Sequence, residues 1–377
     1  LVDSIEKNKI CFNNIIGYAS DTCNVMFGQH NSVASRLKEK IPNTFLMRCI
    51  CHTAHLCASY ACEKLPRTAE ELLRDVYNYF SNNVKRQDQF RVVQLFSDIE
   101  PHELLRPCQT RWLSLNSCVS RLIEQWDALT QYFEAVHTHD NLLVSQKILS
   151  LLKNPVWKLY FHFLNFVLPK FTELNVMFQS SKSSVHCLHN GLNAIYIEFL
   201  SCYLTKAYWK RVSLKDIDPA SKVNFLPLSS MYMGIKIALC LSTEVYKQKA
   251  QDVQYFLKCV QEFYIEAASQ IRKRFPIGDP VIEMLQVLDP AISHAKFPSL
   301  CPLATRFPNI IPEPQLQVLD NQWRKLSYST LPFNSEDMEP EEFCVKFVPP
   351  SGAKERMTSR ILYAMSDSEM SESDTDL

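Results

Sequence analysis

Residues 14–20 read NIIGYAS, and Asp21 follows them directly. This short apolar run predicts a buried strand with a carboxylate at its C-terminal end. A second run, TFLMRC at 44–49, follows the turn signal Pro42-Asn43 and predicts another strand.

A helix is predicted between these strands, over NSVASRLKEK at 31–40, with Ser32 or Asn31 as its cap. From Thr53 to Tyr60 the apolar residues again recur at helical spacing. Strand, helix, strand and helix therefore alternate over the first 80 residues, which is typical of an α/β fragment.

Beyond residue 80 the pattern is almost wholly helical, because apolar residues recur three and four positions apart. The helices predicted from residue 69 onward lie at 69–82, 86–96, 113–135, 142–152, 155–178, 185–205, 229–244, 252–275, 280–288 and 313–325. Periodicity ends near residue 329, and the final SDSEMSESDTDL is acidic and serine-rich, which predicts a disordered tail.

The composition argues against several classes of protein. The 377 residues include only 6 glycines, which argues against a glycine-rich phosphate loop. Basic and acidic residues balance at 40 each, so DNA contact would need a local basic patch. The 14 cysteines are irregularly spaced with no signal peptide, which indicates reduced thiols in the nucleus or cytosol. Apolar stretches such as Trp157–Leu168 are too short and too polar to cross a membrane.

Three local features carry candidate chemistry, and the first is Asp21. A carboxylate at a strand end can hold a hard cation such as Mg²⁺. The alternative is that Asp21 only caps the following turn through its side chain.

The second feature is CICHTAH at 49–55. Cysteine and histidine at this spacing invite a zinc interpretation, but a structural zinc site needs four ligands. Cys57 and Cys62 are too close on one helix to complete a usual finger. The favoured interpretation is a half-buried cysteine and a histidine with a local hydrogen bond.

The third feature is Arg111-Trp112. A guanidinium beside an indole can pair with a phosphate and stack on a base. The alternative is a helix start with Trp112 in the core.

Together and in this order, the features resemble the hAT superfamily of DNA transposases. SDTCNVM at 20–26 resembles the family's second-Asp strand, and Cys49-x-x-His52 followed by Leu56 resembles its Cys-x-x-His motif. TRWLSLNSCVSRLIEQWDALTQYF at 110–133 resembles the Arg-Trp segment. The resemblance covers roughly residues 12–330 and is dense to about 180.

The resemblance implies a mainly α protein, with a ribonuclease-H-like α/β core interrupted by a large all-α insertion. In active members two Asp and one Glu hold two divalent metals for phosphodiester chemistry. Asp21 matches the second acid, and Cys49 and His52 match the motif beside the active site. Trp112 matches the residue that stacks on an extruded base, with Arg111 near the phosphates. His52, Arg111 and Trp112 are thus the implied DNA-binding residues.

Departures from the family pattern indicate that the chain is catalytically incomplete. Only some 20 residues precede Asp21, too few for the strand of the first catalytic Asp, and the BED-type zinc finger is absent. The third acid has a weak counterpart, Glu355 in SGAKER at 351–356, which is one residue short of the family motif. Asp21 is therefore interpreted as a vestigial metal ligand, with Mg²⁺ or Mn²⁺ as cofactor only if activity remains.

These observations predict a partial core at 1–80, a helical insertion at 81–300, a remnant of the lead-in to the dimerisation region at 301–345 and an acidic tail at 346–377. The expected function is a transposase-derived nuclear protein, with the cytoplasm as alternative location, acting by DNA or protein binding without catalysis. Expected partners are DNA, further copies of the chain or other transposase-derived proteins, and no membrane. Two alternatives stay open: a fragment of an active transposase, and a helical interaction scaffold without a DNA role.

Overall fold

Strand β1 (Gly17–Ser20) and strand β2 (Phe45–Arg48) pair in parallel, with Gly17 opposite Phe45 and Ser20 opposite Arg48. Helix α3 (Val33–Lys40) lies between them in the chain, since parallel strands need a crossover connection. The computed structural model describes residues 2–107, 115–137, 142–179, 184–289 and 299–327. Both predicted strands and the helix between them are confirmed.

Helix α3 begins where its serines satisfy the first backbone donors. Ser32 Oγ accepts from the Ser35 N–H at 3.1 Å, and the Ser32 N–H donates to Ser35 Oγ at 2.9 Å. This reciprocal pair is a capping box, and such a cap stabilises a helix by about 1 kcal/mol. Of the two predicted caps, Ser32 is therefore the one that the fold uses.

The chain divides into two units. Unit 1 comprises residues 1–53, 175–194 and 275–377, and unit 2 comprises residues 54–174 and 195–274. Helices dominate the described part of both, which confirms a mainly α protein. The predicted domain boundaries at 80, 300 and 345 stay predictions.

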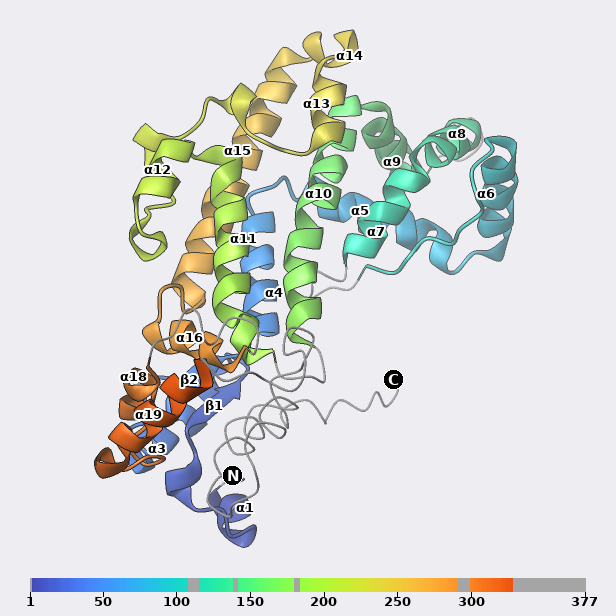
Figure 1. Ribbon diagram of the computed structural model, residues 1–377. Coiled ribbons are helices and arrows are strands. Elements are labelled where there is room, and N and C mark those ends of the chain that lie inside the picture. The colour runs from blue at the N-terminus through green and yellow to red at the C-terminus, as the bar shows by residue number, and fades with distance from the viewer. Residues whose placement is uncertain (1, 108–114, 138–141, 180–183, 290–298, 328–377) are drawn as a thin grey trace. The chain divides into compact units, whose positions relative to one another are not determined.

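Unit 1 contains the two strands and short helices around them (Figure 1). Arg306 ties a late segment to the early one, because its guanidinium donates to the Asn43 carbonyl at 2.8 Å. The elements of unit 1 besides those already given are α1 (Val2–Lys7), η1 (Phe12–Asn14), α2 (Asn24–Phe27), η3 (Val185–Cys187), α16 (Pro280–Met284), η7 (Leu285–Leu288), α18 (Cys301–Arg306), η8 (Glu313–Gln315) and α19 (Leu316–Ser327).

Helices build unit 2, which includes most of α4 (Ile50–Cys62), α10 (Pro155–Phe178) and α11 (Leu188–Tyr203), whose other ends belong to unit 1. Its further elements are α5 (Thr68–Ser81), α6 (Val84–Phe96), α7 (Leu115–Glu124), α8 (Trp126–His137), α9 (Leu143–Lys153), α12 (Lys206–Arg211), η4 (Leu214–Asp216), η5 (Lys222–Asn224), η6 (Leu228–Ser230), α13 (Ile235–Leu241), α14 (Glu244–Lys247) and α15 (Ala250–Arg274).

Aromatic rings form the core between α10, α11 and α15, which lie side by side in unit 2 (Figure 1). Phe163 of α10 has no exposed surface and meets Phe263 edge-on, with ring centroids 5.0 Å apart. Phe199 of α11 reaches both Phe171 and Tyr264. The Tyr264 hydroxyl donates to the Tyr232 carbonyl at 2.6 Å, so its polar end is satisfied.

A second aromatic cluster joins α5, α6 and α8. Phe80 of α5 lies 5.0 Å from Phe90 of α6 and 5.1 Å from Tyr132 of α8, measured between ring centroids. Tyr79 adds a contact to Phe133 at 4.9 Å. Within the described part of the chain, helix α6 packs through the face that carries Phe90.

The single helix predicted over 113–135 is wrong, because Gln125 separates α7 from α8. Gln94 donates to Gln125 Oε1 at 2.9 Å, and Gln125 Nε2 donates to the Glu100 carbonyl at 3.1 Å. Both amides are at most 2% exposed, so each needs these bonds. The two helices are separated at the residue whose side chain belongs to this buried network. The network joins residues far apart in the chain, so helical periodicity does not predict it.

Replacing Gln125 with methionine keeps the volume and removes the amide. We expect a loss of about 2 kcal/mol in the free energy of unfolding, because the Glu100 carbonyl loses its donor and Gln94 loses an acceptor. Reversible denaturation followed by circular dichroism measures this. Gln146→Met, at an exposed glutamine of α9, is the control and should stay within about 0.5 kcal/mol. Equal losses in the two variants would contradict the role given to the network.

The helix predicted over 229–244 is also corrected, since only Ile235–Leu241 (α13) is helical as a continuous piece. Gly234 precedes it with φ at 91°, a conformation that side chains other than glycine rarely adopt. A Cβ there would also lie 3.0 Å from the Phe166 ring.

Among the helices that the structure describes, none is long and apolar enough to span a bilayer.

Candidate functional site

The candidate site lies in unit 1, at the carboxyl ends of the two parallel strands. Asp21 follows the last residue of β1, and Cys49 follows the last residue of β2. The Cys49 N–H donates to the Ser20 carbonyl at 2.7 Å, so strand pairing extends one residue past the ladder. The residues predicted from two separate motifs are thus brought to one edge, the edge where α/β proteins bind ligands.

Asp21 is an exposed carboxylate held by the turn that follows it. The Cys23 N–H donates to Asp21 Oδ1 at 3.3 Å. The pKa of Asp21 is lowered, chiefly by a hydrogen bond from the Cys23 side chain, with smaller contributions from the Cys23 N–H and from the nearby His52. This hydrogen bond is the turn cap expected for Asp21, and the carboxylate is also within electrostatic reach of His52.

Cys49 stands at the N-terminus of α4 (Ile50–Cys62), where its carbonyl accepts from the Thr53 N–H at 3.0 Å. The pKa of its thiol is lowered to about 6. The largest cause is a hydrogen bond from the Cys51 side chain, and the N–H groups of His52 and Cys51 and the charge of His52 add to it. Burial opposes the shift but is outweighed. Donors at a helix N-terminus favour a thiolate in this way.

Cys51 is the member of the site whose role sequence reasoning missed. Its Sγ lies 3.7 Å from the Asn175 carbonyl of α10, within unit 1, and its thiol is also the main stabiliser of the Cys49 thiolate. The available signal was its position in the first turn of a helix directly after a strand, two residues from another cysteine. It was weighed only as a zinc ligand.

The other predicted site residues do not lie at this strand edge or are outside the described residues. Arg111 and Trp112 lie outside the described residues, as do Glu355 and the acidic tail, so their roles stay predictions. Cys57 and Cys62 are buried on α4, and burial raises the pKa of Cys57 to about 12. Among the residues that the structure describes, no three His, Cys, Asp or Glu side chains are grouped to hold a metal ion.

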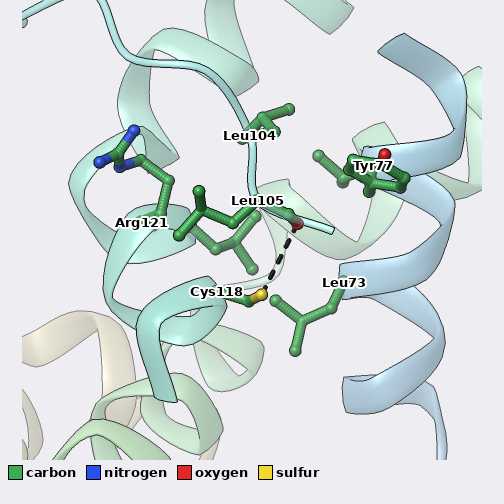
Figure 2. Close-up of a pocket in the computed structure, with 8 residues that line it drawn as sticks. Leu73, Tyr77, Leu104, Leu105, Cys118 and Arg121 are labelled. Carbon is green, nitrogen blue, oxygen red and sulfur yellow. Dashed lines mark hydrogen bonds between the residues drawn. The ribbon is translucent and has the colours of Figure 1, made fainter. Parts of the chain in front are cut away.

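A hollow in unit 2 is too small for an organic ligand. It measures about 10 Å³, room for about one water molecule, and lies between α5, α7 and the segment before residue 108. Figure 2 shows Leu73, Leu105 and Cys118 around it, with the Cys118 thiol directed at the Leu105 carbonyl, 3.6 Å away. The strand edge of unit 1 is therefore the better candidate.

Comparison with known proteins adds no identity. No protein-family model matches the sequence, and no solved structure was found to match its fold.

Proposed function

We propose that this chain is a transposase-derived nuclear protein, similar to hAT transposases, that contacts DNA without a complete catalytic centre. The observation that carries the proposal is the position of Asp21 and of the Cys49–His52 motif at one edge of a parallel strand pair. The resemblance puts the same two motifs side by side in a ribonuclease-H-like core. The chain order of β1, α3, β2 and the start of α4 supports such a core.

The chemistry of DNA cleavage explains why contact is proposed and cutting is not. Two-metal catalysis needs carboxylates that hold both ions around the scissile phosphate. Asp21 is the one acid with a close match to the family motif, and Glu355 matches its motif poorly. Binding requires less: a guanidinium for phosphate and a ring for an unpaired base, which Arg111, Trp112 and His52 would provide.

The proposal is tested with purified full chain and a fluorescent hairpin-ended DNA duplex carrying one unpaired base. Anisotropy titrations between 50 and 200 mM salt should show salt-dependent binding, because released counterions drive phosphate contacts. Trp112→Ala should weaken binding about tenfold through lost stacking. Arg111→Ala should reduce the slope of log K against log salt by about one. Trp209→Ala, at a half-buried tryptophan outside the motif, is the matched control and should change neither value.

Two results would overturn the proposal. Absence of salt-dependent binding, or binding unchanged in both Arg111→Ala and Trp112→Ala, would remove the DNA contact and favour a helical interaction scaffold. Cleavage of the duplex in Mg²⁺ or Mn²⁺, lost in Asp21→Ala, would replace it with the active-transposase alternative.

A further inference from the structure

Helix α6 of unit 2 exposes an apolar stripe on the side opposite its buried face. Val84, Val92 and Leu95 are 71%, 66% and 63% exposed, and the neighbouring Phe96 is 86% exposed. Phe90 and Gln94, on the other side of the helix, are buried against the rest of unit 2. A helix that is apolar on both sides has one face without a partner among the residues that the structure describes.

Two charged residues, Asp88 and Arg91, lie between Val84 and Leu95 on the same side of α6. With about 100° of rotation per residue, Val84, Asp88, Arg91 and Leu95 fall within about 60° of arc. The steps between them are four, three and four residues, the spacing of positions that pack in a helix pair. Asp88 and Arg91 are exposed, and neither takes part in the ion pairs of the described residues.

The order of these four residues is self-complementary when the helix meets a second copy running in the opposite direction. A two-fold axis midway between Asp88 and Arg91 places Asp88 against Arg91 of the other copy, and Val84 against Leu95, each pair twice. A parallel pair in register would instead set Asp88 against Asp88 and Arg91 against Arg91, which like charges disfavour. For two copies of α6, the charge order therefore favours the antiparallel pair over the parallel one.

We infer that the chain self-associates through antiparallel pairing of α6 (Val84–Phe96), using the stripe Val84, Asp88, Arg91 and Leu95. Val92 lies beside this seam, on the side away from Phe90 and Gln94, and extends its apolar area. The inference stands on α6 alone and does not depend on the proposed DNA contact. A 13-residue helix gives a seam about 20 Å long, which is short for a stable interface, so the dimer should be weak. We expect a Kd on the order of 10 μM.

Charge reversal tests the pairing, with sedimentation velocity over a concentration series as the measurement. Asp88→Arg and Arg91→Asp should each weaken the dimer at least about tenfold, because each variant faces its copy with four like charges. The double variant D88R/R91D should return to within about threefold of the natural chain, since the order stays self-complementary. An equimolar mixture of the two single variants should form a heterodimer, since each then supplies the charges that the other lacks.

Circular dichroism melts of each variant show whether a loss comes from unfolding, and at these exposed positions we expect changes within about 0.5 kcal/mol. A natural chain that stays monomeric at 100 μM and above would overturn the inference. So would dimers of equal strength in all variants. Single variants that lose the dimer without rescue by the double variant and by the mixture would overturn the antiparallel register.

Discussion

Phe163→Ala is expected to lower the free energy of unfolding of unit 2 by about 3–5 kcal/mol, the range for removing a fully buried phenyl ring. Phe163 has no exposed surface and touches the rings of Phe263 and Tyr264. Its loss opens a cavity that helices packed on three sides cannot close. The corresponding drop in Tm is on the order of 10 °C for a unit of this size, measured by differential scanning calorimetry.

The matched control is Phe96→Ala, the same substitution in the same unit at a ring that is 86% exposed. It should change stability by no more than about 0.5 kcal/mol when measured at low protein concentration. Phe163→Leu, which keeps most of the volume, should cost much less than Phe163→Ala. Comparable losses for the two alanine variants would contradict the assignment of the core to the rings between α10, α11 and α15.

Strand and helix positions in this chain follow from local patterns of apolar residues. The runs at 14–20 and 44–49 each contain a strand, because a short run of apolar residues is recognised without any distant partner. The 24-residue helix α10 was predicted over its full observed range, since apolar residues fill its broad face. The cap of α3 was narrowed to Ser32 or Asn31 for an equally local reason, and Ser32 is the residue that caps the helix.

Breaks in the helices could not be predicted in this way. Gln125 fits helical periodicity, but its amide is committed to Gln94, 31 residues earlier, and to the Glu100 carbonyl. The turn before α13 requires the positive φ of Gly234 and a close approach to Phe166. Such contacts join residues far apart in the chain, so the local sequence does not encode them.

The candidate site shows the same division between local and distant information. The resemblance was enough to expect Asp21 and His52 in one region, because it implies that the motif of Cys49 and His52 lies beside the active site. The chemistry of Cys49 was not predicted, because it depends on how the Cys51 side chain turns within the first helical turn. Hydrogen-bond geometry at that scale has no counterpart in residue spacing.

Alkylation of Cys49 by iodoacetamide is expected to have its pH midpoint near 6, about three units below the 9.0 of an unperturbed thiol. The thiolate is the reacting species, and the donors of Cys51 and of the start of α4 hold it ionised. At pH 7, more than about 90% of a thiol with that pKa is ionised, against about 1% of an ordinary one. Site-resolved mass spectrometry of the Cys49 peptide, quenched at intervals between pH 5 and 10, measures the midpoint.

Cys51→Ala should move that midpoint upward, because it removes the largest stabiliser of the thiolate. Cys301→Ala, at another half-buried cysteine of unit 1, should leave it unchanged. The folded-state pKa of Cys49 is below the unfolded value, so its contribution to stability is complete above about pH 9 and is lost as the pH falls through about 6. The stability difference between the natural chain and Cys49→Ala should therefore grow from pH 6 to 9. A midpoint near 9 in the natural chain, or one unmoved by Cys51→Ala, would contradict the hydrogen bond between these two thiols.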